Sequence, residues 1–444
     1  TLQDAIDHVV ADQAATCFEG YEALDHASCV QALVVNGEPA STAKAGDAVQ
    51  VVLDTTPFYG EGGGQVGDRG VLAGSDLIVR IESVSRSRDV FVHAGRIERG
   101  QLTVGDAITA QVDRACRRRA QANHTATHLL QAALKQVVDP GIGQAGSLVD
   151  FDRLRFDFHA PQAVTTEQLE QIETLINGWI AEAHSLLVEE MAIDQAKAAG
   201  AVAMFGEKYA DVVRVVDVPG VSMELCGGTH VANTAEIGLF KIVGESGVAA
   251  GIRRIEAVAG ASVLGYLNER ELVVKQLGDR FKAQPGEIVE RVVALQEELK
   301  STGKALLAAQ AGLAVAKSAA LATKAVAIGG FQLLVERLDG VDGTGLQGAA
   351  QSLAAQLGDG AAVVLGGLPD PSDQGKVILV AAFGKDVIAA KQQAGKFIGT
   401  IAKLCGGGGG GRPNLAQAGG RDGAALDGAL EQARSQLNSA LQPD

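Results

Sequence analysis

The sequence predicts an α+β multidomain fold with a small β-barrel, an α+β domain that contains zinc, a helical hairpin or coiled coil, and a C-terminal α/β domain. Three observations predict this class. Short β-like runs fill most of the first 112 residues, helical patterning is nearly unbroken over residues 262–325, and the remainder alternates strands and helices. A chain of 444 residues is also too long for one ordinary core.

Residues 1–112 predict an N-terminal helix followed by the barrel. Apolar residues stand at helical spacing over Thr1–Val10. Turn signals such as Asn36-Gly37 then separate β-rich runs at Val30–Val35, Ala48–Leu53, Leu77–Val84 and Ala107–Val112. Short strands at this spacing are typical of a small barrel or sandwich.

Residues 113–261 switch to an α+β pattern. After Asp113 the apolar stripe from Leu129 to Val137 predicts a helix, which Asp139-Pro140-Gly141 stops. A second helix is predicted over Thr166–Leu187. Strands are predicted at Val212–Val218, Phe240–Glu245 and Ile252–Ala259.

Residues 262–325 are helical in pattern, with one break at Gln284-Pro285-Gly286. Beyond the break, apolar residues alternate at spacings of four and three, as in a heptad repeat. They include Ile288, Val292, Leu295, Leu299, Leu306 and Leu313. This seam would close a hairpin within the chain or join two chains, and the period leaves both open. We expect a homodimer through the helical and C-terminal regions.

Residues 326–444 predict a compact C-terminal α/β domain. Helices are predicted over Leu346–Leu357 and Lys385–Leu404, and strands at Ala361–Leu365 and Val377–Phe383. The second helix runs toward six consecutive glycines, Gly406–Gly411. Such a run is either a flexible linker or a place where the backbone approaches a ligand closely, and both interpretations stay open.

Composition narrows the class of protein. The five cysteines are an odd, scattered set, which gives no disulfide framework and favours a reducing cytoplasm. No apolar run approaches the roughly 18 residues of a membrane span. The net charge of −15 argues against indiscriminate binding of polyanions, although Arg114, Arg117, Arg118 and Arg119 form a local basic cluster.

The strongest chemical signal is two pairs of metal-binding residue types, His124 with His128 and Cys226 with His230. Each pair has i, i+4 spacing, and three imidazoles with one thiolate make a tetrahedral zinc set. Solvated histidines and a buried thiol are the alternative. Thr125 stands where a metalloprotease helix carries its general-base glutamate, which argues against peptide hydrolysis. The ligand number leaves a structural and a catalytic metal both open.

A glycine-rich motif, Thr55-Thr56-Pro57-Phe58-Tyr59-Gly60-Glu61-Gly62-Gly63-Gly64-Gln65-Val66-Gly67-Asp68, adds a second signal. From its residues alone it indicates a glycine-rich hairpin turn with a neighbouring aromatic. Together with the two ligand pairs and Gly251–Val258, it resembles the editing domain of alanyl-tRNA synthetase and the free-standing relatives that deacylate mischarged alanine tRNA. The helical hairpin and the Gly406–Pro413 segment resemble that synthetase's C-terminal domain, so the resemblance covers essentially the whole chain.

The resemblance implies an enzyme that removes serine or glycine from Ser-tRNA(Ala) or Gly-tRNA(Ala). It implies the C-terminal part of an alanine-tRNA ligase without its aminoacylation core. A pocket sized for alanine cannot strongly reject glycine or serine, so a second, hydrolytic site is needed. By the same resemblance, Zn2+ is the cofactor, tRNA(Ala) is the partner, and Thr56 and Gln65 are catalytic and substrate-binding residues, with Thr56 sensing the serine hydroxyl.

Several arginines are candidates for RNA contacts. We expect Arg253 near the substrate, and Arg114, Arg118, Arg119 and Arg412 against tRNA. A solvated helix face is the alternative for the cluster after Asp113. Two other functions stay open, namely a free-standing trans-editing deacylase and a non-catalytic tRNA-binding and dimerisation module with structural zinc. We expect a cytoplasmic protein with no membrane association.

Overall fold

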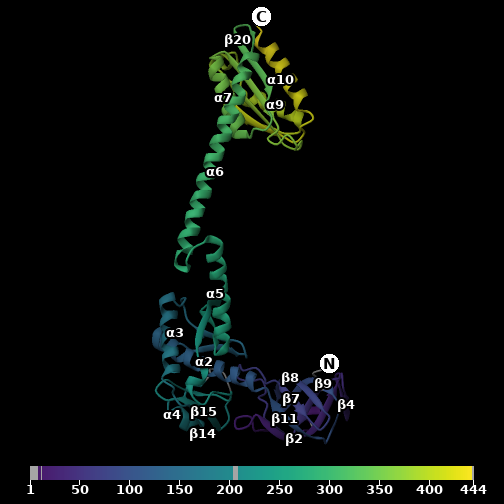
Figure 1. Ribbon diagram of the computed structural model, residues 1–444, viewed down its shortest axis with the longest axis vertical. Helices are drawn as coiled ribbons and strands as arrows, with labels where there is room; N and C mark the ends of the chain where they lie inside the picture. The colour runs from purple at the N-terminus through teal and green to yellow at the C-terminus, as the bar shows by residue number, and fades with distance from the viewer. Residues whose placement is uncertain (1–8, 12, 204–208, 443–444) are drawn as a thin grey trace. The chain divides into compact units, whose positions relative to one another are not determined.

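The computed structural model in Figure 1 describes residues 9–11, 13–203 and 209–442 of the chain. It comprises two compact units, Thr1–Gln276 and Leu277–Asp444, and each unit is described by itself. Most of the N-terminal stretch for which we predicted a helix lies outside the described residues.

Six antiparallel strands close into a barrel in the first unit. The strand order is β11-β7-β8-β9-β5-β2, and β11 also pairs with β2, which closes the ring. The ring strands are β2 (Asp25–Val35), β5 (Ala48–Leu53), β7 (Gly70–Ala73), β8 (Ile78–Ser87), β9 (Val90–Arg99) and β11 (Ala107–Val112). Short strands lie around it: β1 (Cys17–Phe18), β3 (Glu38–Ala40), β4 (Thr42–Lys44), β6 (Thr55–Thr56) and β10 (Gln101–Thr103). The four predicted strands are confirmed, and the sheet is a barrel rather than a sandwich.

The second part of this unit packs two helices on a four-stranded sheet. Helix α2 (Arg114–Val137) begins after Asp113, whose side chain accepts a hydrogen bond from the Cys116 backbone N–H. The sheet has the order β12-β13-β18-β17, and α3 (Thr166–Ala181) completes the layer. Its strands are β12 (Gln144–Val149), β13 (Leu154–His159), β17 (Phe240–Ala249) and β18 (Ile252–Ala259). One apolar core joins α2, α3 and this sheet.

The helix predicted over Thr166–Leu187 is shorter than expected. It ends at Ala181, because Ala183 takes a left-handed backbone conformation with φ of 58° and the chain turns away. The next residues form a small sheet of order β14-β15-β16, with a short helix and a 3-10 turn. These elements are β14 (Leu187–Ala192), α4 (Ile193–Ala198), β15 (Val212–Val218), β16 (Ser222–Leu225) and η1 (Thr234–Ile237).

A buried arginine joins α2 to the loops of the barrel. The Arg117 guanidinium forms an ion pair with the Asp68 carboxylate, and both side chains are almost fully buried. It also donates to the backbone carbonyls of Gly20 at 2.5 Å and Pro57 at 2.8 Å. These contacts satisfy a charge that would otherwise be costly to bury. Arg117 is therefore a structural member of the basic cluster.

The long helical region is confirmed. It consists of α5 (Ala261–Phe281), η2 (Pro285–Glu287), α6 (Ile288–Ala319) and η3 (Ala320–Lys324), and the break falls at Pro285 as predicted. The heptad residues Leu299, Leu306 and Leu313 are 76%, 58% and 56% exposed. By length and composition alone, Pro285–Lys324 is a helix among the described residues that could cross a membrane, and the expected lack of membrane association stays a prediction. Self-association through the seam stays a prediction.

The second unit is built on a six-stranded sheet of order β19-β20-β21-β22-β24-β23. Only the β20–β21 pair is parallel among the described strands of this sheet. Helix α7 packs with α6 and the sheet in one core, and α9 and α10 pack in another. The elements are β19 (Val326–Ile328), β20 (Phe331–Arg337), α7 (Gly343–Leu357), β21 (Ala361–Gly367), β22 (Val377–Phe383), α8 (Lys385–Ala389), α9 (Ala394–Ala402), η4 (Lys403–Cys405), β23 (Gly408–Gly411), β24 (Leu415–Gly420) and α10 (Leu426–Leu441).

The glycine run is not a flexible linker, and its close approach to a ligand stays a prediction. Gly408–Gly411 forms strand β23, which pairs with β24 and packs against α9. A Cβ at Gly409 would lie 2.4 Å from the Ala418 Cα, so a larger residue would push the strand away. The helix predicted before it is also divided, because Lys391 takes a φ of 63° between α8 and α9.

We expect Arg117→Ala to lower the free energy of unfolding of the first unit by about 3–5 kcal/mol, since Asp68 would stay buried without its partner. The single tryptophan, Trp179, packs against the core of this unit, so its fluorescence in urea can report the transition. Arg119→Ala is the control. Its partner Asp152 is exposed, so a change of no more than about 1 kcal/mol is expected. Equal losses for the two variants would contradict the structural role of Arg117.

Candidate functional site

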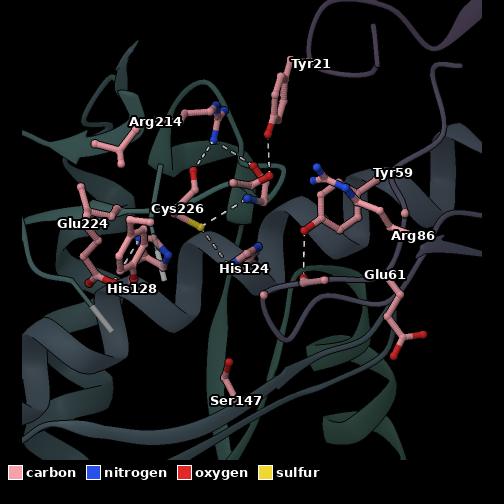
Figure 2. Close-up of a pocket in the computed structure, with 18 of the residues that line it drawn as sticks. Tyr21, Tyr59, Glu61, Arg86, His124, His128, Ser147, Arg214, Glu224 and Cys226 are labelled. Atoms are coloured by element: carbon pink, nitrogen blue, oxygen red, sulfur yellow. Dashed lines mark hydrogen bonds and ion pairs between the residues drawn. The ribbon is translucent and has the colours of Figure 1, made fainter. Parts of the chain in front are cut away.

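The four predicted metal ligands come together. Helix α2 places His124 and His128 one turn apart, and the loop after β16 supplies Cys226 and His230. One ligand atom from each residue lies within 4.8 Å of all the others. The Cys226 Sγ lies 3.4 Å from the His124 Nε2 and 3.2 Å from the His230 Nε2. Figure 2 shows His124 and His128 on the helix beside Cys226.

Gln65 orients the first histidine. Its side-chain Oε1 lies 2.8 Å from the His124 Nδ1 and accepts a hydrogen bond from the Thr229 backbone N–H at 2.9 Å. Its Nε2 donates to the Thr229 hydroxyl at 2.9 Å. An acceptor at Nδ1 assigns the proton to that nitrogen and leaves Nε2 free to ligate. The fully buried Gln65 amide therefore acts on the ligand and is absent from the cavity lining.

The other two histidines also have an oxygen near Nδ1. The His230 Nδ1 lies 3.1 Å from the Thr125 hydroxyl, and the His128 Nδ1 lies 3.7 Å from the Glu224 carboxylate. A neighbouring oxygen therefore faces the Nδ1 of each ring, which leaves Nε2 for a metal. Thr125 stands where a metalloprotease helix carries its glutamate. Here its hydroxyl orients His230, a candidate ligand.

The electrostatics of the cluster fit a divalent metal. Burial alone would raise the pKa of the Cys226 thiol, but His124, His230 and His128 outweigh it and hold that pKa well below its usual range. Burial opposes charge on His128, yet Glu224 and Cys226 raise its pKa to about 9. Burial lowers the pKa of His230 to about 3. Zinc prefers a thiolate beside neutral imidazoles, so binding it would require His128 to release the proton that Glu224 and Cys226 help it to hold.

A cavity of about 440 Å3 opens beside the ligands. One wall comes from the barrel side and is rich in aromatic rings, and the other comes from α2, β12, β15 and the loop after β16. Its lining includes Phe18, Tyr21, Tyr59, Arg86, Phe91, His124, Thr127, His128, Gln131, Gln144, Ser147, Arg214, Glu224 and Cys226. The volume is in the range of a small-molecule site. The metal group therefore faces a space in which a ligand can lie.

The structure places Thr56 behind the cavity wall. Its side chain is fully buried, and its hydroxyl lies 2.7 Å from the His93 Nε2. The His93 Nδ1 lies 3.0 Å from the Val51 carbonyl, so Nε2 is the acceptor. Thr56 does not line the cavity. It pairs in the sheet with Phe18, and Phe18 does line the cavity. Its predicted contact with the substrate is therefore not seen in this arrangement.

The predicted RNA-binding arginines lie outside the cavity lining. Arg253 on β18 forms two hydrogen bonds of 2.6 Å with the Glu245 carboxylate on β17, which occupies its guanidinium. Arg114 and Arg118 are exposed on α2, and Arg412 is exposed between β23 and β24 in the second unit.

Arg119 is half-buried and pairs with Asp152 at 2.5 Å. Arg118 is 4.0 Å from Glu236. Arg114 and Arg118 therefore keep accessible side chains for an RNA contact, whereas the Arg119 guanidinium is engaged. Their tRNA-binding role stays a prediction.

Sequence reasoning missed Tyr21, Arg214 and Glu224. Tyr21 follows β1 and Arg214 lies on β15, and both contact the loop that carries Cys226. No spacing rule links Tyr21 to Gly227 across 206 residues. Glu224 carried a local signal, because it lies two residues before a ligand.

Three family models match this chain. The model for tRNA synthetases class II (A) matches residues 1–116, and the model for the threonyl and alanyl tRNA synthetase second additional domain matches residues 213–256. The DHHA1 domain model matches residues 330–439. The second match includes Cys226 and His230, and the third falls within the second unit.

Curated relatives are similar along the full chain. The alanine–tRNA ligase of Synechococcus sp. (strain CC9902) is 92% identical over 100% of this chain and 50% of its own length. That of Prochlorococcus marinus (strain MIT 9303) is 76% identical over 99% of this chain and 50% of its own length. The chain therefore spans about half the length of the curated relatives it matches. A crystal structure of the C-Ala domain from Aquifex aeolicus alanyl-tRNA synthetase is 26% identical, covers 27% of this chain and 98% of that chain, and has a TM-score of 0.23.

We expect Gly228→Ala to abolish metal binding, because the added Cβ would lie 2.0 Å from the His124 Cε1 and 3.0 Å from the Gln65 Oε1. Gly227→Ala is the matched control, since its Cβ meets only the Tyr21 hydroxyl oxygen at 4.0 Å. Elemental analysis should find about one zinc per chain in wild type and Gly227→Ala. Zinc retained by Gly228→Ala at the wild-type level would refute the assignment of these ligands.

Proposed function

This chain belongs to the alanine–tRNA ligase family, and we propose that its first unit hydrolyses the aminoacyl ester of mischarged alanine tRNA, releasing serine or glycine. The observation that carries the proposal is the opening of the ligand cluster into the cavity. His124, His128 and Cys226 are both members of the cluster and part of the cavity wall. An ester placed in this cavity would lie beside the metal-binding atoms.

The chemistry of the donor set suits ester hydrolysis. A zinc ion, when bound, would supply Lewis acidity for the ester carbonyl and lower the pKa of a bound water. Gln65 and Thr125 would hold His124 and His230 with Nε2 toward the cluster. In the hydrolysis, water attacks the acyl carbon, the bond to the ribose oxygen breaks, and that oxygen takes up a proton. Four protein ligands would also suit a structural ion, and the opening of the cluster into the cavity favours the catalytic role.

Polar side chains in the cavity would provide discrimination. Thr127, Gln131, Gln144 and Ser147 line it together with Glu224. A serine hydroxyl can bond with such groups, whereas an alanine methyl would leave them unpaired. Glycine is small enough to enter without meeting them. This difference would spare correctly charged alanine tRNA.

For the second unit we propose tRNA binding and a contribution to homodimerisation. The exposed Arg412 beside β23 supports the first role. The exposed heptad leucines of α6 support the second, because uncovered apolar residues at this spacing pack against a further helix. We also propose that the exposed Arg114 and Arg118 contact the RNA, that Arg119 joins them by exchanging its ion pair with Asp152 for a phosphate, and that the protein acts in the cytoplasm.

We expect the chain to release serine and glycine from alanine tRNA faster than alanine, and a chelator to abolish the release. Time courses with seryl-, glycyl- and alanyl-tRNA(Ala), with and without the chelator and after zinc is restored, measure both properties. Release that survives complete removal of the metal would exclude catalysis by zinc. Binding of tRNA and zinc without any release would instead support a non-catalytic module.

We propose that Thr56 senses the serine hydroxyl, and expect Thr56→Val to lower deacylation of seryl-tRNA(Ala) more than of glycyl-tRNA(Ala). For this role its hydroxyl must also reach the substrate from its present bond with His93. Rates for the two substrates, measured beside the unfolding midpoint, separate the possibilities. Equal losses with a lower midpoint would assign the hydroxyl to the buried His93 contact, because that ring would lose its partner.

A further inference from the structure

A tyrosine and an arginine from distant parts of the first unit hold the loop that carries Cys226. The Arg214 guanidinium lies over the Tyr21 ring, with its central carbon 4.1 Å from the ring centroid. Such a pair is attracted by the cation–π interaction. Figure 2 shows both side chains directed at the loop beside Cys226.

Three consecutive carbonyl groups of this loop accept hydrogen bonds from the pair. Arg214 Nη1 donates to the carbonyl oxygens of Cys226 at 2.9 Å and Gly228 at 3.0 Å. The Tyr21 hydroxyl donates to the intervening carbonyl of Gly227 at 2.5 Å. The Arg214 backbone carbonyl also accepts from the Cys226 N–H at 3.0 Å. The peptide groups on both sides of Cys226 are therefore fixed.

The loop has little stiffness of its own. Gly227 and Gly228 lack side chains, and Gly228 must do so because His124 occupies the place of a Cβ. Glycine loses more conformational freedom on folding than any other residue, so an unsupported Cys-Gly-Gly loop would sample many positions of the thiolate. External hydrogen bonds to all three carbonyls offset that freedom.

We propose that Arg214 and Tyr21 are positioning residues, which set the place of the Cys226 Sγ and thereby the affinity and geometry of the metal site. The inference builds on the proposed metal-dependent deacylase. The Gly228 N–H also approaches Cys226 Sγ at 3.4 Å, so holding the Gly228 peptide orients a donor toward the thiolate. Neither side chain needs to touch the reacting atoms.

The pair also connects the two walls of the cavity. Tyr21 contacts the Phe18 ring edge-on at 4.9 Å, and Phe18 stacks on Phe91 of the barrel at 5.4 Å. Arg214 belongs to β15 on the opposite wall. Loss of the pair would therefore loosen the thiolate and the aromatic wall together.

A direct RNA contact is the competing role for Arg214, because arginine commonly binds phosphate. The two roles differ in what they change. If Arg214 only contacts a phosphate, its substitution weakens the binding of the RNA substrate. The metal affinity and the geometry of the metal site then stay unchanged. A positioning role acts on the metal site in the absence of any RNA.

The test uses Arg214→Lys, which keeps the charge but loses the planar guanidinium that stacks on Tyr21 and donates from Nη1 to two carbonyls, and Tyr21→Phe, which keeps the ring but loses the hydroxyl. Arg270→Lys and Tyr266→Phe are matched controls. Their guanidinium and ring form a similar stack at 3.3 Å on α5, outside the cavity lining. All proteins are the full chain, and thermal unfolding followed by circular dichroism checks that each variant is folded.

Zinc affinity is measured by competition with a chelator, and the site geometry by the thiolate-to-cobalt charge-transfer absorption of the Co2+-substituted protein. We expect both cavity variants to bind zinc about 10- to 100-fold more weakly and to change the cobalt spectrum, as outer-shell substitutions do. Both should lower kcat without a matching rise in KM, and the controls should behave as wild type.

Unchanged zinc affinity and cobalt spectrum in folded Arg214→Lys and Tyr21→Phe would overturn the proposal, and a raised KM alone would assign Arg214 to RNA binding. An equal effect in the controls would also overturn it. The outcome is separable from the proposed function, since wild-type protein that binds cobalt without releasing serine would refute only the deacylase.

Discussion

The candidate site depends on how helix α2 is buried along its length. Its first turns carry Arg117, which the barrel loops surround, and its middle carries His124 and His128. Its later turns bury Leu129, Leu130 and Leu134 against the four-stranded sheet. One rigid element thus fixes the barrel, two of the predicted metal ligands and a second core relative to one another. Because α2 is packed at both ends, the positions of His124 and His128 are fixed.

Side chains outside the candidate ligand set orient its three histidines. Gln65 from the barrel-side motif, Thr125 from α2 and Glu224 from β16 each face one histidine Nδ1. Their contacts favour Nε2 as the available nitrogen, and the low dielectric around them strengthens the hydrogen bonds of Gln65 and Thr125 and the attraction between Glu224 and His128. The motif around Gln65 therefore supports the candidate metal site. Gln65 would affect the substrate indirectly, by orienting His124.

At two separate places in this chain, a glycine allows another part of the protein to lie against the backbone. Gly228 leaves room for His124, and Gly409 lets β23 lie against Ala418. Neither place is a linker, although a run of six glycines in a sequence is commonly one. In both, the neighbouring backbone is held by hydrogen bonds, to Arg214 in the first case and to β24 in the second. Such external contacts supply the rigidity that the glycines lack.

Local pattern determined much of this protein. Strand and helix positions such as β22 and α2 follow from periodicity and turn residues, and the four ligands follow from spacing and donor type. The end of α3 and the break at Lys391 could not be predicted, because they depend on left-handed backbone conformations of ordinary residues. Only the tertiary structure decided that Arg253 pairs with Glu245, that Thr56 faces His93, and that Tyr21 reaches Gly227. Those contacts join residues far apart in sequence, and their partners are chosen by how the elements pack.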